Sequence, residues 1–97
     1  MLVVVAYDIN TEDKAGEKRL QHISNLCCRY GQRVQNSLFE MFINWSQFLE
    51  IKNKITECID EKQDSVRIYL LGNDYKNKTI YLGKNKLIDV DKGNIII

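Results

Sequence analysis

Asp8, which follows directly on an apolar run, is the residue in the sequence best placed to do chemistry. Positions 2–6 are apolar and lead through Tyr7 to the acid, a pattern expected for a central strand that holds Asp8 rigidly at its end. A Mg²⁺ ion takes only one or two protein carboxylates and fills its other positions with waters and substrate phosphates. Two copies of Asp8 across a twofold axis would be enough for such a site. The alternative is that Asp8 only caps the turn after the strand.

The polar segment QRVQNS, at positions 32–37, offers groups that bind phosphate. Arg33, Gln35 and Ser37 are expected to alternate on one side of an extended chain, and Phe39 is next in line. An arginine binds phosphate through two parallel hydrogen bonds, and amides and hydroxyls add neutral ones. The segment is therefore a candidate nucleic-acid contact, and the alternative is an ordinary polar edge strand.

The other reactive side chains are better explained by packing or solvation. Arg19 lies on the predicted first helix, where a charge usually does no more than solvate a face. Tyr7 is expected in the core, although it could also position a phosphate or a water. His22, the only histidine, flanks the apolar stripe of the first helix, and Cys27 is expected in the core. The sequence shows no Gly-rich phosphate loop, no Cys-x-x-Cys pair and no serine–histidine–acid set.

The totals describe one small domain, residues 1–97, with nearly balanced charge. The chain has 14 basic and 13 acidic residues and a net charge of +1, so any contact with nucleic acid must come from a local patch. No stretch approaches the roughly 18 apolar residues of a membrane span, and the start of the chain lacks the pattern of a signal peptide. Three cysteines, an odd number, argue against a disulfide framework. We therefore expect a reduced, cytoplasmic protein that binds no membrane.

Hydrophobic spacing predicts the first two elements that must position these residues. The apolar run at 1–7 predicts a strand covered on both faces. Apolar residues three and four apart then predict a helix, with Thr11 as its N-cap and Tyr30 as its last residue. Gly31 is expected to end the helix in a left-handed conformation.

The second half of the chain repeats the alternation of strand and helix. A strand is expected over 38–43, and the trio 35–37 before it is either a tight hairpin turn or a bulge. Asn44, with Gln47 three residues later, has the spacing of a capping box and begins a second amphipathic helix. A further strand is expected over 66–71.

This order of elements predicts an α+β, ferredoxin-like βαββαβ domain with an antiparallel sheet. Right-handed connections place both helices on one face of the sheet. The other face carries too many apolar residues to remain in water, which favours a homodimer that pairs sheet to sheet. Residues 1–78 form the core, and 79–97 form a C-terminal strand and tail. TIYLG is a short strand candidate there, and the three closing isoleucines bury either on a partner subunit or on their own domain.

Three stretches together resemble the small CRISPR-associated endonuclease family, the second of the core spacer-acquisition proteins. They are VVVAYDIN, then KRL in the first helix, then YGQRVQNSLFE. The later segments have the order and length of that family, so the resemblance covers nearly the whole chain. The form GQRVQNS is most similar to the branch associated with type I-C systems.

The resemblance implies roles for single residues. Asp8 matches the strand-end aspartate that faces its twin in the dimer and is assigned the metal, Mg²⁺ or Mn²⁺. Where some members carry a second arginine on the first helix, this chain has Glu17, which weakens that helix as a nucleic-acid contact. The residues that match the positions around Asp8, the first helix and the following motif, and so are candidate nucleic-acid contacts, are Tyr7, Arg19, Arg33, Ser37 and Phe39.

The resemblance also implies partners and an activity. It implies a homodimer in which the C-terminal strand of each protomer joins the other's sheet, and an integrase subunit as a further partner. The implied function is CRISPR adaptation, or spacer acquisition, with metal-dependent hydrolysis of phosphodiester bonds in double-stranded DNA or single-stranded RNA. The alternative is a non-catalytic dimeric scaffold that binds duplex DNA within the integrase complex. A third class is a ferredoxin-like small-molecule regulator, and the lack of a Gly-rich ligand loop counts against it.

Overall fold

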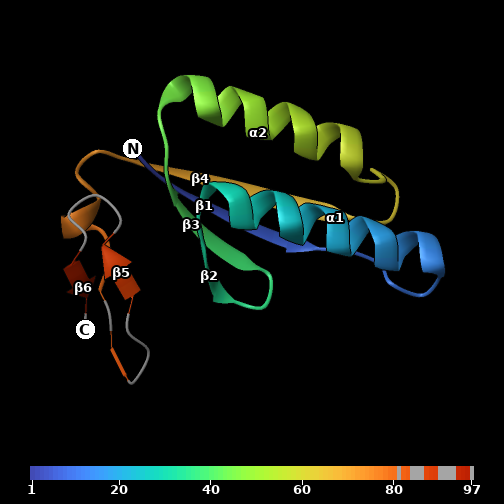
Figure 1. Cartoon of the computed structure of the whole chain (residues 1–97), viewed down its shortest axis with the longest axis horizontal. Helices are drawn as coiled ribbons and strands as arrows, with labels where there is room; N and C mark the ends of the chain where they lie inside the picture. Colours follow the sequence, from blue (N-terminus) through green and yellow to red (C-terminus); the bar gives the residue numbers. More distant parts are fainter. Residues whose placement is uncertain (81, 84–86, 90–93, 97) are drawn as a thin grey trace.

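A four-stranded antiparallel sheet with two helices on one face forms the body of the protein (Figure 1). The computed structural model describes residues 1–80, 82–83, 87–89 and 94–96. The strand order in this part of the chain, β2-β3-β1-β4, is that of a ferredoxin-like domain, so the predicted fold class is confirmed. The elements are β1 (Leu2–Asp8), α1 (Lys14–Tyr30), β2 (Gln32–Gln35), β3 (Leu38–Phe42), α2 (Trp45–Cys58), β4 (Ser65–Gly72), the 3₁₀ turn η1 (Tyr75–Asn77), β5 (Leu87–Asp89) and β6 (Asn94–Ile96).

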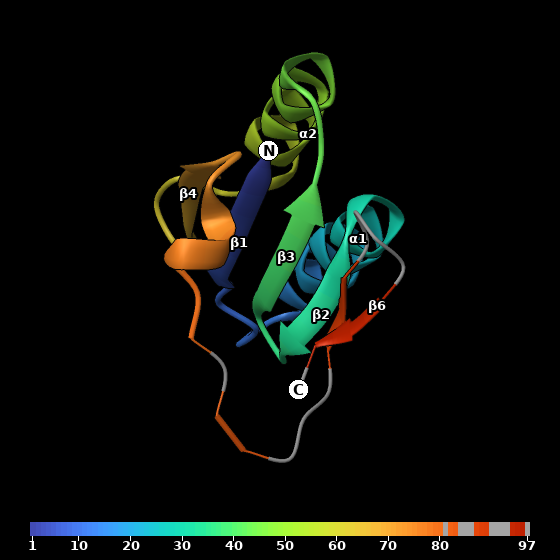
Figure 2. The same cartoon turned by 90° about the vertical axis from the view of Figure 1, so that its left-hand side faces the viewer.

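The hydrophobic core lies between the sheet and the helices, which cover the same face of it in both views (Figures 1 and 2). Alternate residues of β1 point into this layer, and Val3 and Val5 are completely buried there. None of the helices in the described residues is long and apolar enough to span a bilayer. The helices contribute to the core one face each, formed by Ile23, Leu26, Cys27, Phe48, Ile51 and Ile55.

Both ends of α1 differ from the expectation. The N-cap is Asp13, whose carboxylate accepts a hydrogen bond from the backbone N–H of Gly16 at 2.8 Å, while Thr11 is exposed in the preceding loop. The prediction of Thr11 as N-cap is wrong. Two residues with good capping side chains lie close together, and only Asp13 faces the free N–H groups of the first helical turn. Gly31 is extended (φ −157°), not left-handed, because the chain passes straight from α1 into β2.

The start of α2 agrees with the sequence pattern. The Asn44 side chain accepts from the N–H of Gln47 at 2.8 Å, and the Gln47 side chain accepts from the N–H of Asn44 at 3.0 Å. This reciprocal pair is the predicted capping box. Further along α2, Lys54 donates to Glu50 at 3.0 Å, as their i,i+4 spacing suggests.

The segment that the sequence left as hairpin turn or bulge contains both. Residues 36–37 form the turn, and Gln35 pairs with Leu38 while Arg33 pairs with Phe39, so Val34 is an extra residue in the ladder. Paired residues share a sheet face, and Leu38 and Phe39 point to opposite faces. Arg33 therefore lies on the helix side and Gln35 on the other side, and the expectation that they alternate on one side is wrong.

The sheet face without helices, called the open face here, is partly apolar, as expected. The 3₁₀ turn η1 covers one end of it, where the Tyr75 ring packs edge-on against Phe42 with 4.8 Å between centroids. Further along, Val4 pairs with Tyr69, whose side chain is 48% exposed, and with Glu40. Glu40 is half-buried, and this burial raises the pKa of its carboxyl group.

The C-terminal segment forms a separate two-stranded sheet, in which β5 pairs with β6. In the TIYLG segment, Thr79, Ile80 and 82–83 are outside any strand, and Tyr81 lies outside the described residues. Ile80 and Leu82 are 86% and 88% exposed. The last isoleucine also lies outside the described residues, so the burial of the closing isoleucines stays a prediction.

Replacing Gly31 by alanine should strongly destabilise the protein. A Cβ at this position would lie 2.2 Å from the carbonyl oxygen of Glu40 and 2.6 Å from Cγ of Met41, so β2 and β3 would have to separate. We expect Gly31→Ala to lower the free energy of unfolding by about 2–4 kcal/mol, measured by urea denaturation. Gly72→Ala is the matched control, because its Cβ would enter open space and meet only the penalty of a positive φ, about 1–2 kcal/mol. Equal losses would contradict the steric explanation.

Candidate metal and nucleic-acid site

Asp8 stands exposed at the end of β1, on the open face of the sheet. It pairs with Ser65 of β4, and it follows Tyr7, whose side chain points into the core. Within the described residues, its carboxylate has no hydrogen bond and no ion pair to another side chain. The same residues hold no group of three histidine, cysteine, aspartate or glutamate side chains that could bind a metal. At this end of β1, the described residues of a single chain thus offer one free carboxylate, which fits half of a Mg²⁺ site.

Asp64 fixes the two segments that flank Asp8. Its side chain is 0% exposed and accepts hydrogen bonds from the backbone N–H of Asn10 at 3.0 Å and from Nε of Arg19 at 2.8 Å. Asn10 comes two residues after Asp8, and Ser65, the pairing partner of Asp8, comes directly after Asp64. We call this arrangement the Asp64 clasp. It ties the end of β1, the first half of α1 and the start of β4 together.

The charges in the Asp64 clasp support each other. Burial by itself would raise the pKa of Asp64, but the Arg19 guanidinium and the backbone N–H groups of Asp60 and Asn10 outweigh it and hold this pKa below its ordinary value. The same hydrogen bond raises the pKa of Arg19. Arg19, predicted as a nucleic-acid contact, is therefore already engaged within its own chain.

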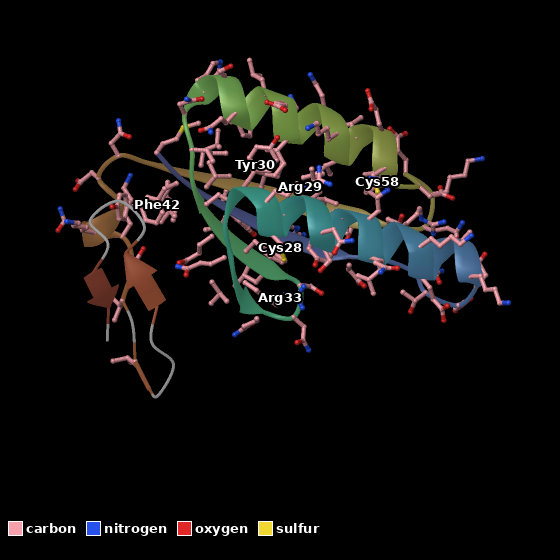
Figure 3. The ribbon with its side chains drawn as sticks, viewed as in Figure 1. Cys28, Arg29, Tyr30, Arg33, Phe42 and Cys58 are labelled. Carbon is pink, nitrogen blue, oxygen red and sulfur yellow. The ribbon has the colours of Figure 1, made fainter. Side chains whose placement is uncertain are left out.

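Arg33 is held against the helix side of the hairpin (Figure 3). Its guanidinium donates a hydrogen bond to Oγ of Ser24 on α1 and lies 5.2 Å from the ring centroid of Phe39. The Tyr7 hydroxyl donates to the same Ser24 Oγ at 3.2 Å, and the rings of Tyr7 and Phe39 stack with 6.1 Å between centroids. The exposed Arg33 guanidinium is thus positioned directly by Ser24 and the Phe39 ring, and the Tyr7 ring supports Phe39.

Burial decides which of these side chains can touch a ligand. Phe39 is 0% exposed and Tyr7 is 6% exposed, so neither ring can contact nucleic acid directly, and both act as supports for Arg33. Arg33 itself is exposed. Ser37 lies beside the end of β1, because its carbonyl oxygen accepts from the N–H of Tyr7 at 3.0 Å.

The structure therefore brings only three of the predicted site residues together, while Arg19 is bound in the Asp64 clasp. Tyr7, Arg33 and Phe39 meet on the helix side, whereas Asp8 points to the open face. Two important residues were missed from sequence. Ser24 looks like an ordinary polar position of a helix, and Asp64 looks like one more charge in the polar loop DEKQD. Nothing local in either stretch signals a partner 17 or 45 residues away.

The cysteines take no part in this arrangement. All three are free, and Cys27 is completely buried. Burial, with a smaller contribution from Cys28, raises the pKa of the Cys27 thiol to about 12, so it is no nucleophile at neutral pH. This agrees with its predicted place in the core.

A ferredoxin-like domain with a free carboxylate at the end of its central strand is the class that fold and site define. The family model described as CRISPR associated protein Cas2 matches residues 1–79. The chain belongs to this family, which confirms the family resemblance of the sequence. Its assignment to the branch of type I-C systems stays a prediction.

Relatives and solved structures agree over most of the chain. A Halalkalibacterium halodurans protein named CRISPR-associated endonuclease Cas2 is 45% identical over 91 residues, 94% of this chain and 95% of that protein. A Chlorobaculum tepidum protein named CRISPR-associated endoribonuclease Cas2 is 39% identical over 97 residues, 100% of both chains. The crystal structure of Streptococcus pyogenes Cas2, at 52% identity, has a TM-score of 0.73 and covers 86% of this chain and 100% of its own.

Removing the charge of Asp64 should weaken the fold and change its acid sensitivity. We expect Asp64→Asn to lower the free energy of unfolding by about 2 kcal/mol at pH 7, because hydrogen bonds to a charged group are lost. The folded-state pKa of Asp64 lies below its unfolded value of about 4. Its stabilisation is therefore present above that unfolded value and is lost as the pH falls through the folded-state value.

The measurement is urea denaturation at several pH values between 2 and 7. The difference between parent and Asp64→Asn should shrink as the pH falls below about 4. Glu12→Gln is the control, because it removes an exposed carboxylate from the loop between β1 and α1, outside the Asp64 clasp. A difference that stays constant over this range would show that Asp64 does not act through its charge.

Proposed function

We propose that two copies of this chain pair through their open faces and form a metal-dependent endonuclease that works in CRISPR spacer acquisition. The observation that carries the proposal is the exposed carboxylate of Asp8, which lies on the open face without a partner in the described residues. One such group from each copy supplies the two carboxylates that a Mg²⁺ or Mn²⁺ site needs. The proposal places the dimer in the cytoplasm, where its three free cysteines stay reduced.

Apolar side chains in water support the pairing. Tyr69 is 48% exposed in the middle of β4 on the open face, and Ile80 and Leu82 are 86% and 88% exposed in the segment after η1. Large apolar side chains that are exposed on a single chain can mark an interface between proteins. We propose that Tyr69 packs against the partner's sheet and that the segment from Ile80 onward crosses to the partner, so that C-terminal strands are exchanged.

The residues of the chain would divide the work. The metal, when bound, activates water and offsets the negative charge that develops on the phosphate. Asp8 holds the metal at a fixed place because the Asp64 clasp fixes the chain on both sides of it. Arg33, exposed on the edge strand β2 and supported by Phe39, binds a backbone phosphate, and Ser37 lies beside Asp8 in the turn. Such contacts read phosphate and not base sequence, so RNA and DNA are both candidate substrates.

A second candidate function is a scaffold for duplex DNA and an integrase subunit. It is favoured by the lack of a complete set of metal ligands in one chain, since the described residues hold no group of three histidine, cysteine, aspartate or glutamate side chains that could bind an ion. In this case Arg33 still binds phosphate, and Asp8 has no chemical role. Spacer acquisition in cells that carry Asp8→Ala separates the two functions, because full acquisition favours the scaffold and its loss favours the nuclease.

The nuclease activity should depend on Asp8. We expect Asp8→Asn to reduce cleavage of single-stranded RNA or double-stranded DNA more than about 100-fold, since changes to the outer-shell partners of metal ligands already cost about 10–100-fold. Cleavage is measured with Mg²⁺ or Mn²⁺ and again after chelation, and circular dichroism checks that the variant is folded. Asp74→Asn, at an exposed acid outside the site, should cleave like the parent. Equal rates for Asp8→Asn and the parent would refute the catalytic role.

Dimerisation should depend on the open face. We expect Tyr69→Glu to convert the dimer to a monomer, because two carboxylates would be buried against an apolar face without partners. Light scattering coupled to gel filtration measures the mass. Trp45→Glu is the matched control, because Trp45 is 56% exposed at the start of α2, on the helical side. A Tyr69→Glu protein that remains a dimer would show that the copies pair through another surface.

A further inference from the structure

A groove between α1 and α2 lies on the opposite side of the protein from the open face. Its volume is about 560 Å³, which is within the range of about 300–1,000 Å³ found for small-molecule sites. Figure 3 shows Tyr30, Arg29 and Cys58 in this order along the line between the two helices. The residues that line it are His22, Asn25, Leu26, Arg29, Lys54, Glu57 and Cys58.

Two cations gather at one end of the groove. Lys54 donates to Glu50 at 3.0 Å and to the Tyr30 hydroxyl at 3.4 Å, and the bond to Glu50 raises the pKa of this ammonium, so it stays charged. Arg29 is exposed, and no acid among the described residues pairs with it. Glu50 offsets the charge of Lys54, which leaves Arg29 as the cation without an acid partner among the described residues.

The other end of the groove is polar and carries an acid. Cys58 contacts the backbone of Arg19, while Lys54 contacts Tyr30, so the two helices run antiparallel and position 57 lies across from the His22 end of α1. Glu57, His22 and Asn25 also line the groove, one or two helical turns from Lys54 and Arg29. Leu26, only 5% exposed, is an apolar lining residue between the two ends. This end offers acceptors and donors for hydroxyl or amino groups.

We propose that this groove binds a small polar molecule with one phosphate group, of the size of a mononucleotide. The phosphate lies between Arg29 and Lys54, and the sugar or base reaches Glu57 and Asn25. A nucleic-acid strand along the groove fits less well, because its next phosphate would approach the Glu57 carboxylate. The site is separate from Asp8 and Arg33, so it does not depend on the proposed nuclease function.

Calorimetric titration of the full chain tests the site with three probes: inorganic phosphate, adenosine 5′-monophosphate and a single-stranded oligonucleotide. We expect the mononucleotide to bind more tightly than phosphate. We expect Arg29→Gln to weaken mononucleotide binding at least about 10-fold, because a hydrogen-bonded charge pair is lost. Lys52→Gln is the matched control, since it removes one positive charge from the exposed part of α2 outside the groove. Its affinity should stay within about twofold of the parent.

Three results would overturn the proposal. The first is that neither phosphate nor the mononucleotide binds. The second is that Lys52→Gln weakens binding as much as Arg29→Gln, which would indicate attraction by total charge only. The third is that the oligonucleotide alone binds at Arg29, which would make the groove part of a nucleic-acid surface. Backbone amide shifts in NMR give a second readout, and with the mononucleotide they should change over 22–29 and 54–58 and not around Asp8.

Discussion

The interaction on which the rest of the structure depends is the buried carboxylate of Asp64. It accepts hydrogen bonds from one side-chain cation and from the backbone N–H groups of two loops. The loop after β1 and the helix α1 are thereby joined to the loop before β4, which is 54 and 45 residues away in sequence. A buried charge is stable only when its hydrogen bonds are complete, which makes this meeting point all-or-none. The end of β1 and the start of β4 are fixed there. Asp8 is the last residue of β1, and it pairs with Ser65, the first residue of β4. A rigid position for the candidate metal ligand follows from a residue that does not touch the metal.

The candidate site is divided between the two faces of the sheet. The carboxylate of Asp8 belongs to the open face, and the supported guanidinium of Arg33 belongs to the helix side at the edge strand. A single chain can therefore offer metal binding and phosphate binding only at two separate places. A substrate that used both would have to pass around the sheet edge or meet them from different protomers. Both proposed functions use Arg33 and only the proposed nuclease uses Asp8, so each of them is compatible with this division.

Much of the fold could be predicted from local sequence, and the site only in part. Local preference and tertiary packing agree in three elements: the apolar run of β1, the apolar stripe of α1 and the Asn44–Gln47 capping box of α2. Asp8 could be found because an acid after an apolar strand is unusual. Asp64 and Ser24 could not, because their partners are distant and their surroundings look like solvated loop and helix. The choice of Asp13 over Thr11 as N-cap depends on where the helix axis points, which local composition does not tell.

The extra residue Val34 determines on which face of the sheet Arg33 lies. A regular ladder with the same turn would pair Val34 with Phe39 and Arg33 with Glu40, and the guanidinium would then lie on the open face with Asp8. The bulge instead places it over the Phe39 ring. The number of residues in the hairpin thus decides on which sheet face the Arg33 charge lies. Replacing a side chain in this hairpin is therefore a milder change than inserting or deleting one residue.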